Sequence, residues 1–70
     1  MPPLDQKDPH VALGFQHAIG HQPPYRWLDR ENQRRYDYGF LMGCGAMPEP
    51  GLTWTELEQL MRERGFVRDR

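Results

Sequence analysis

Three helix-start signals, spaced along the chain, constrain its fold more than any other feature of the sequence. Asp8 can accept hydrogen bonds from free backbone N–H groups, and Pro9 after it suits the first position of a helix. Thr53, followed by Glu56 three residues later, has the pattern of a capping box. Between these two signals, Asp29 is the best cap for a second helix. We therefore expect three helices.

Glycines mark where two of these helices should end. Gly20 can adopt the left-handed conformation that terminates a helix, and Gly65 can do the same for the third helix. After Gly65, Phe66 can fold back onto Met61, as in a Schellman motif. The predicted helices cover about 9–19, 25–43 and 54–64; the second begins only after residue 29 if Asp29 is its cap.

Little in the chain favours a β-sheet. It contains five β-branched residues, and no segment alternates apolar and polar side chains over the length of a strand. The lone cysteine, Cys44, excludes the disulfide framework that small secreted domains usually need. No apolar run is long enough to span a bilayer. We predict a small all-α, three-helix domain over 8–66 in the cytoplasm, with a flexible arm at 1–7 and a charged tail at 67–70.

Small residues indicate how the first two helices pack. Gly14 and Ala18 on the first helix, and Gly39 and Gly43 on the second, allow two backbones to come close. We expect a tight antiparallel pair, a helical hairpin. The residues expected to face inward from the first helix are Val11, Phe15, Ala18 and Ile19, with His10, Leu13 and His17 facing outward. The aromatic residues expected to fill the space around the glycines are Phe15, Tyr36 and Phe40. A second copy of the chain could use Gly39 and Gly43 equally well, so a homo-oligomer stays an alternative.

Side chains that could carry catalysis are sparse. The chain has no serine, which excludes a serine triad. His17 and His21 are four residues apart, but Gly20 should end the helix between them, so we expect surface histidines and no metal site. Cys44 lies at a predicted helix C-terminus, whose negative dipole end disfavours a reactive thiolate. We predict a protein that is not an enzyme and needs no cofactor.

Arginine and aromatic residues point to a binding role instead. The formal net charge of -1 argues against a dedicated nucleic-acid binder. Arginine is enriched at protein interfaces together with Tyr, Trp and Met, and here eight of the nine basic residues are arginine. Arginines four residues apart on the second helix would form a stripe that contacts phosphates or an acidic protein, or else an ordinary solvated face. Trp27 and Tyr38 either anchor a partner or pack under the third helix. The candidate partner-binding residues are Tyr25, Arg26, Trp27, Arg30, Arg34 and Tyr38.

The first two predicted helices also carry a series of short motifs in a recognisable order. The motifs are Gly14-Phe15-Gln16, Ala18-Ile19-Gly20, Pro24-Tyr25, Asn32-Gln33-Arg34, Tyr36 and Gly39-Phe40. Over residues 14–43 the chain resembles the bacterial ribosome modulation factor family, with Pro24, Tyr25, Tyr36, Gly39 and Phe40 matching as structural positions. The resemblance implies a compact helical hairpin and binding to ribosomal RNA and proteins during dormancy. Ribosome-binding members of that family are strongly basic, whereas this chain is not.

Three functional hypotheses follow. The first is a small non-catalytic binding protein, of bacterial or phage accessory type, that docks on a larger protein assembly and modulates or inhibits it. The alternative is a ribosome- or RNA-binding module of the ribosome modulation factor type, using the arginine stripe. The third is a small enzyme, which would need a metal or a cleft between subunits. None of the three places the chain in a membrane.

Overall fold

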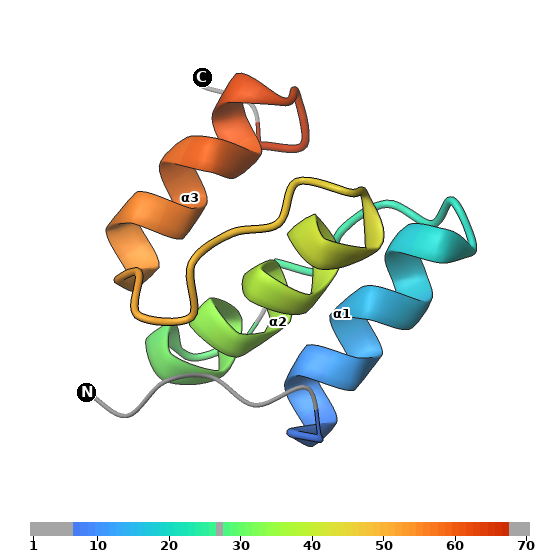
Figure 1. Ribbon diagram of the computed structural model, residues 1–70, viewed down its shortest axis with the longest axis horizontal. Helices are drawn as coiled ribbons and strands as arrows, with labels where there is room; N and C mark the ends of the chain where they lie inside the picture. The colour runs from blue at the N-terminus through green and yellow to red at the C-terminus, as the bar shows by residue number, and fades with distance from the viewer. Residues whose placement is uncertain (1–6, 27, 68–70) are drawn as a thin grey trace.

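The computed structural model describes residues 7–26 and 28–67, and within them the chain forms three α-helices (Figure 1). These are α1 (Pro9–Ile19), α2 (Arg30–Gly43) and α3 (Trp54–Glu63). The described part contains no strand, so the all-α prediction is confirmed. Most of the predicted arm (1–6) and of the predicted tail (68–70) lies outside the described residues.

All three helices begin where the sequence predicts a cap. The Asp8 carboxylate accepts a hydrogen bond of 2.9 Å from the backbone N–H of His10. The Asp29 carboxylate accepts one of 2.8 Å from the N–H of Asn32, so α2 begins at Arg30 and the longer form from residue 25 is wrong. The capping box before α3 is complete, with the Thr53 hydroxyl and the Glu56 carboxylate each accepting from the other residue's backbone N–H.

Each helix ends in a Schellman motif, in which two backbone N–H groups bond back to carbonyls of the last turn. At the end of α3, the N–H of Phe66 donates to the carbonyl of Met61 at 2.9 Å, as predicted. The left-handed residues of these three motifs are His21, Gly45 and Gly65, with φ of 57°, 84° and 82°. The prediction that Gly20 is left-handed at the end of α1 is wrong, because Gly20 has φ of -85° and His21 takes that role.

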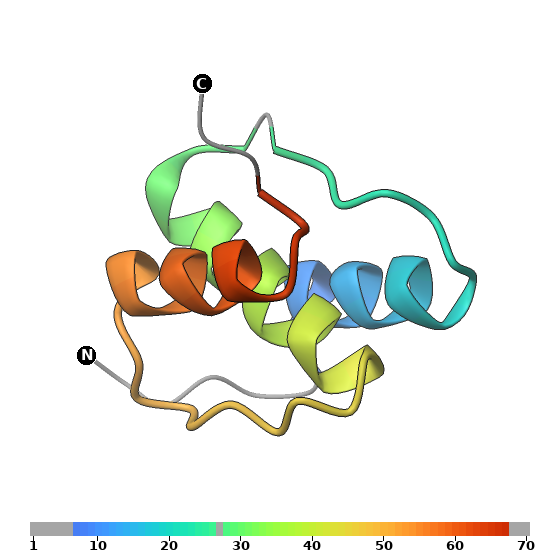
Figure 2. The same cartoon turned by 90° about the horizontal axis from the view of Figure 1, so that it is seen from above.

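Helices α1 and α2 run in the same general direction, so the predicted antiparallel hairpin is wrong. Gly39 lies against Val11, and four residues later Gly43 lies against Phe15 and Ala18. Contacts that advance together along both helices require a parallel pair. The connection over 20–29 returns along the pair to reach the start of α2 (Figures 1 and 2). The extended turn at Pro23 and Pro24 lies within this return segment.

The two helices approach closely because glycine lies at their contact. A Cβ on Gly14 would overlap the carbonyl oxygen of Tyr36, and a Cβ on Gly39 would overlap that of Val11. The predicted close approach is therefore confirmed. Since α1 already occupies Gly39 and Gly43, these glycines are not available to a second copy of the chain.

Helix α2 is the middle layer, with α1 on one side and α3 on the other (Figure 1). Within the described residues, α1 and α3 do not pack on each other. The buried hydrophobic core is formed by Val11, Ala18, Tyr36, Tyr38, Phe40, Leu41, Leu57 and Met61. Phe66 closes the end of this core, with its ring edge-on to Phe40 at 4.9 Å between centroids.

The inward face of α1 is narrower than predicted. Phe15 and Ile19 are 40% and 56% exposed, so their assignment to the core is wrong. With the backbones in contact, only Val11, Gly14 and Ala18 fit between α1 and α2. His17, predicted to face outward, instead turns toward α2 and is half-buried.

Candidate docking surface

The arginine stripe predicted on α2 does not form an outer surface. Arg34 is 1% exposed, because the segment leading to α3 covers it. Its Nε donates to the carbonyl of Leu52 at 2.8 Å, and its Nη2 donates to that of Pro50 at 3.3 Å. A third hydrogen bond, of 3.2 Å, joins Nη1 to the carboxylate of Glu31. Arg34 therefore holds the connection between α2 and α3 and cannot contact a partner in this structure.

Arg26 is also directed inward, onto Asp37. Its Nη1 donates to both carboxylate oxygens of Asp37, at 2.5 and 2.6 Å, and its Nη2 donates to Glu58 of α3 at 3.2 Å. Gln33 donates to the same Asp37 carboxylate at 3.0 Å. Burial raises the pKa of Asp37, while the hydrogen bonds and charge of Arg26 oppose that rise. The cluster joins the return segment, α2 and α3, which makes it a structural crosslink.

The aromatic residues predicted to contact a partner differ in their exposure. Tyr38 is 5% exposed, which favours its role in packing over its role as a partner anchor. Tyr25 is 47% exposed, while its backbone N–H donates to the Tyr36 hydroxyl at 2.9 Å. That hydroxyl also lies 2.6 Å from His17 Nδ1, and burial raises the pKa of Tyr36. Trp27 lies outside the described residues.

Arg30 is the exposed member of the predicted stripe. Its guanidinium lies 5.0 Å from the centre of the Trp54 ring, at the start of α3. Of the six predicted site residues, only Arg30 and Tyr25 are therefore both described and exposed. They do not make a continuous surface with Arg26 and Arg34, because Arg26 is paired with Asp37 and Glu58, and Arg34 is buried under the segment that leads to α3.

Groups that could support catalysis are dispersed. Cys44 caps the end of α2, as predicted, and burial raises the pKa of its thiol, which disfavours the thiolate. His17 is hydrogen-bonded inside, whereas His21 lies beyond the end of α1 and is exposed. Among the described residues, no three His, Cys, Asp or Glu side chains are grouped as a metal site would require.

The outer face of α1 is the surface that sequence analysis missed. No Asp, Glu, Lys or Arg occurs anywhere in Pro9–Ile19, although a helix at the surface of a globular protein usually has a charged face. Leu13, Phe15 and Ile19 are large, apolar and 39 to 56% exposed. The signal was present in the sequence as an eleven-residue helix without charge, but Phe15 and Ile19 were assigned to the core.

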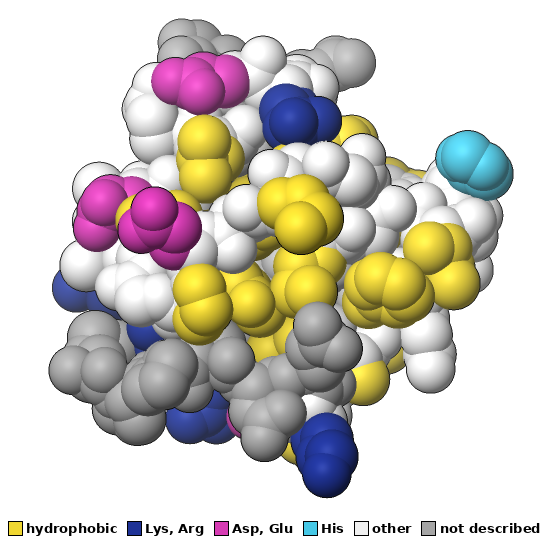
Figure 3. Space-filling model, viewed as in Figure 1, with side chains coloured by type: hydrophobic (Ala, Val, Ile, Leu, Met, Phe, Trp, Pro, Cys, Tyr) yellow, Lys and Arg dark blue, Asp and Glu magenta, His cyan; other side chains and the backbone are white. Residues whose placement is uncertain are grey.

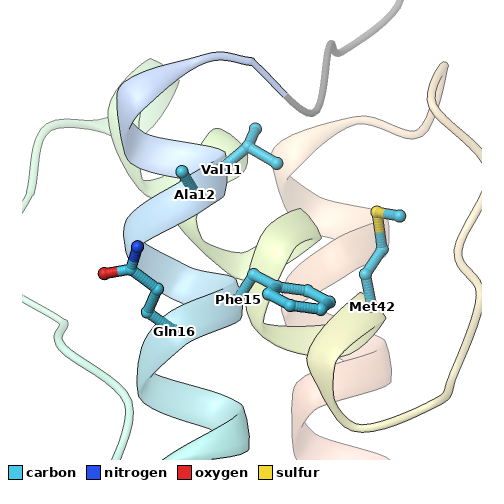
Figure 4. A pocket seen from close by; sticks show the side chains of 5 residues that line it. All are labelled: Val11, Ala12, Phe15, Gln16 and Met42. Atoms are coloured by element: carbon cyan, nitrogen blue, oxygen red, sulfur yellow. The ribbon is translucent and has the colours of Figure 1, made fainter.

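A shallow groove runs between this face and the end of α2. It is lined by Val11, Ala12, Phe15, Gln16 and Met42, and it contains a hollow of about 200 Å³ (Figure 4). The Phe15 ring of α1 points toward Met42 of α2, and the Met42 side chain extends past it along the groove. Figure 3 shows that hydrophobic side chains gather over α1 and the segment that follows α2. In that segment Met47 is 81% exposed. We call the groove and Ile19, one turn after Phe15, the α1 docking face.

None of the described helices is long and apolar enough to cross a membrane. In comparisons with known proteins, no family model, no curated protein and no solved structure matches the chain. The similarity to the ribosome modulation factor family therefore stays a prediction from short motifs, and the geometry of the chain itself carries the functional argument.

Proposed function

We propose that this chain is a small, non-catalytic binding protein that docks on a larger protein assembly through the α1 docking face and modulates it. One observation supports the proposal above all: an eleven-residue helix without a formal charge leaves Phe15 and Ile19 40% and 56% exposed. A helix that is apolar on most sides is normally covered. Among the described helices, only α2 packs on α1.

The size of the groove favours a macromolecule over a small ligand. Its hollow is about 200 Å³, whereas small-molecule sites usually have about 300–1,000 Å³ and enclose most of the ligand. A face of this kind gains binding energy by removing apolar area from water, at about 25 cal/mol per Å². The proposal retains the predicted cytoplasmic setting, in which Cys44 stays a reduced, structural thiol.

The inward direction of the arginines weighs against the RNA-binding alternative. Phosphate recognition needs accessible cations, and Arg34 is buried while Arg26 is already paired with two carboxylates. Arg30 alone remains exposed on that stripe, over the face of Trp54. We therefore place the binding surface on α1 and treat RNA dependence as an outcome of the test.

The proposal can be tested by affinity capture from the source organism with matched variants. Ile19→Glu puts a charge on the docking face, and Leu13→Glu puts the same charge on α1 about 160° around the helix from Phe15 and about 120° from Ile19. We expect the wild type and Leu13→Glu to retain the same protein, and Ile19→Glu to retain at least about tenfold less. Equal capture by both variants would disprove a docking role for this face. Capture that nuclease treatment abolishes would favour the RNA-binding alternative.

A further inference from the structure

We infer that the hydrogen bond between His17 and Tyr36 is a pH-sensitive contact: when His17 takes up a proton, the return segment separates from the helix pair at Tyr25. The inference is independent of the proposed docking role. It follows from where the return segment is held, from the single hydrogen that the Tyr36 hydroxyl can donate, and from the burial of that hydroxyl.

The first half of the return segment has few backbone groups that can hold it. The N–H of Gln22 donates to the carbonyl of His17 at 2.9 Å, but Pro23 and Pro24 have no N–H. The next N–H is that of Tyr25, which donates to the Tyr36 hydroxyl at 2.9 Å. The two prolines also line a hollow of about 370 Å³, so this stretch is not tightly packed on the helix ends. Attachment of the stretch to α2 therefore depends on the hydrogen bond from Tyr25.

The Tyr36 hydroxyl must play a different role toward each of its two partners. Its oxygen accepts from the N–H of Tyr25, so its own hydrogen is left for His17 Nδ1, 2.6 Å away. Tyr36 is 0% exposed, and its hydroxyl has no other hydrogen-bond partner among the described residues. Burial raises the pKa of Tyr36, so the hydroxyl keeps its proton. The network therefore requires a neutral His17 that accepts at Nδ1 and carries its hydrogen on Nε2.

Proton uptake by His17 reverses the role of Nδ1. Two N–H donors then face one oxygen, and the hydrogen of the Tyr36 hydroxyl loses its acceptor at a site that water does not reach. A charged donor makes the stronger hydrogen bond, so the imidazolium keeps the oxygen and the N–H of Tyr25 loses it. His17 is half-buried, so its ring is within reach of solvent protons. Histidine changes charge between pH about 5 and about 8.

The charged groups around this contact are paired with one another. Asp37 of α2 and Arg26 of the return segment act on Tyr36 with opposite signs. They also form an ion pair, which Glu58 of α3 extends. Among the described helices, α3 does not pack on α1. The pairing leaves His17 as the group whose charge change acts directly on the hydroxyl.

The second half of the return segment should stay in place. Gln33 donates to the carbonyl of Tyr25 at 2.8 Å and accepts from the N–H of Leu28 at 3.3 Å. Arg26 stays on Asp37. None of these hydrogen bonds uses the imidazole of His17 or the hydroxyl of Tyr36, so opening should be confined to 22–25.

Amide hydrogen exchange followed by NMR on the full chain tests the inference. The protection of the Tyr25 N–H, relative to the unfolded chain at the same pH, should fall at least about fivefold from pH about 8 to about 5. In His17→Asn a side-chain carbonyl replaces Nδ1 as acceptor and takes up no proton in this range, so the protection should not change with pH. His21→Asn is the matched control. It removes an exposed histidine near the same end of α1 and should keep the response of the wild type.

Three outcomes would overturn the inference. The first is protection of the Tyr25 N–H that does not change with pH in the wild type. The second is an equal response in His17→Asn, which would assign the effect to Asp37, whose pKa is raised by burial. The third is a simultaneous loss of protection in all three helices, which would mean global unfolding.

Tyr36→Phe gives a second test that does not depend on the folding of His17→Asn. It removes the hydroxyl and keeps the ring, so the Tyr25 N–H should be equally unprotected at both pH values, while the helical circular dichroism is retained. Protection of that N–H at pH about 8 that is lost at about 5 in this variant would also overturn the inference.

Discussion

Helices α1 and α2 have environments opposite to those their compositions suggest. Five of the 14 residues of α2 are charged, yet this helix lies in the middle and buries Gln33, Arg34 and Asp37. None of the 11 residues of α1 is charged, yet this helix lies at the outside and exposes Phe15 and Ile19. The two helices touch at glycines, where an added side chain would overlap the facing backbone.

The comparison shows two ways of dealing with a mismatch between residue type and environment. The polar groups of α2 are satisfied within the chain, because Arg26 meets Asp37 and Arg34 meets two loop carbonyls. The apolar groups of α1 have no such cover in the described structure. An interior mismatch is solved by hydrogen bonds, whereas the exterior mismatch on α1 is the observation on which the proposed docking role rests.

The largest effect should come from the glycine contact between the two helices. In Gly39→Ala, the new Cβ would overlap the carbonyl oxygen and the Cα of Val11, which are backbone atoms and cannot move aside. Alanine favours the helical state by up to ~1 kcal/mol, but overpacking at backbone should outweigh this and cost more than about 3 kcal/mol. Thermal unfolding followed by circular dichroism measures the loss. Gly51→Ala is the control, since nothing lies within 4 Å of its added Cβ. Equal stability of the two variants would contradict the close packing of α1 on α2.

The second prediction concerns the cluster in which Arg26 joins Asp37 of α2 and Glu58 of α3. Arg26→Met leaves the Asp37 carboxylate buried without its counter-charge, and we expect a loss of about 3 kcal/mol at neutral pH. The loss should depend on pH. Burial already raises the folded-state pKa of Asp37 above 3.8, and removing Arg26 raises it further, so the folded variant binds a proton more tightly than the unfolded chain. Its stability therefore falls as pH rises through that raised pKa.

Urea unfolding at pH about 4 and pH about 7 checks this sign. The free energy lost by Arg26→Met should be clearly smaller at the lower pH, where Asp37 is closer to being protonated. Arg35→Met is the matched control. Arg35 forms longer ion pairs with Asp8 and Glu31, at 3.6 and 3.5 Å, and is partly exposed, so its loss should cost less than about 1 kcal/mol. Equal losses at both pH values would show that Asp37 does not depend on Arg26.

The local features of this fold were predictable from the sequence. Asp8, Asp29 and Thr53 cap their helices through residues two or three positions away, so the information lies within one turn of chain. The Schellman end at Phe66 is local in the same way. The close approach at Gly39 was also predictable, because few functions other than close contact require glycine inside a helix.

The features that failed depend on contacts between distant segments. The direction of α1 relative to α2 is set by the ten-residue segment between them, and an extended segment can return along a helix as readily as it can turn. Arg34 was assigned to a surface because arginine is usually exposed. Its burial depends on the carbonyls of Pro50 and Leu52, which lie 16 and 18 residues away. The docking face was missed for the same reason. Gly14 takes the position nearest α2 and leaves Phe15 exposed, and this arrangement depends on how the two helices pack.

The third prediction tests whether stability needs the planar guanidinium group of Arg34, and not only its positive charge. Arg34→Lys keeps the positive charge but cannot donate to the carbonyls of Leu52 and Pro50 and to Glu31 in the same planar arrangement. We expect a loss of about 1–3 kcal/mol in the free energy of unfolding, since the part-buried carbonyls of Leu52 and Pro50 lose donors and a charged ammonium takes the buried position. Arg30→Lys, at an exposed position over Trp54, should cost less than about 1 kcal/mol. Similar losses in the two variants would mean that burial of Arg34 does not matter to stability.

The smallest effect compares the ends of the same two helices. The left-handed residue after α1 is His21, whereas the equivalent residue after α2 is Gly45. A residue with a side chain loses roughly 1–2 kcal/mol of stability in that conformation. Glycine avoids this cost, but part of the gain is lost because glycine has more conformational freedom in the unfolded chain. His21→Gly should therefore stabilise the fold by up to about 1 kcal/mol, and Gly45→His should destabilise it. Nothing lies within 4 Å of an added Cβ at Gly45, so backbone conformation is the only local difference. Unfolding midpoints that move in the same direction for both substitutions would contradict the left-handed ends of α1 and α2.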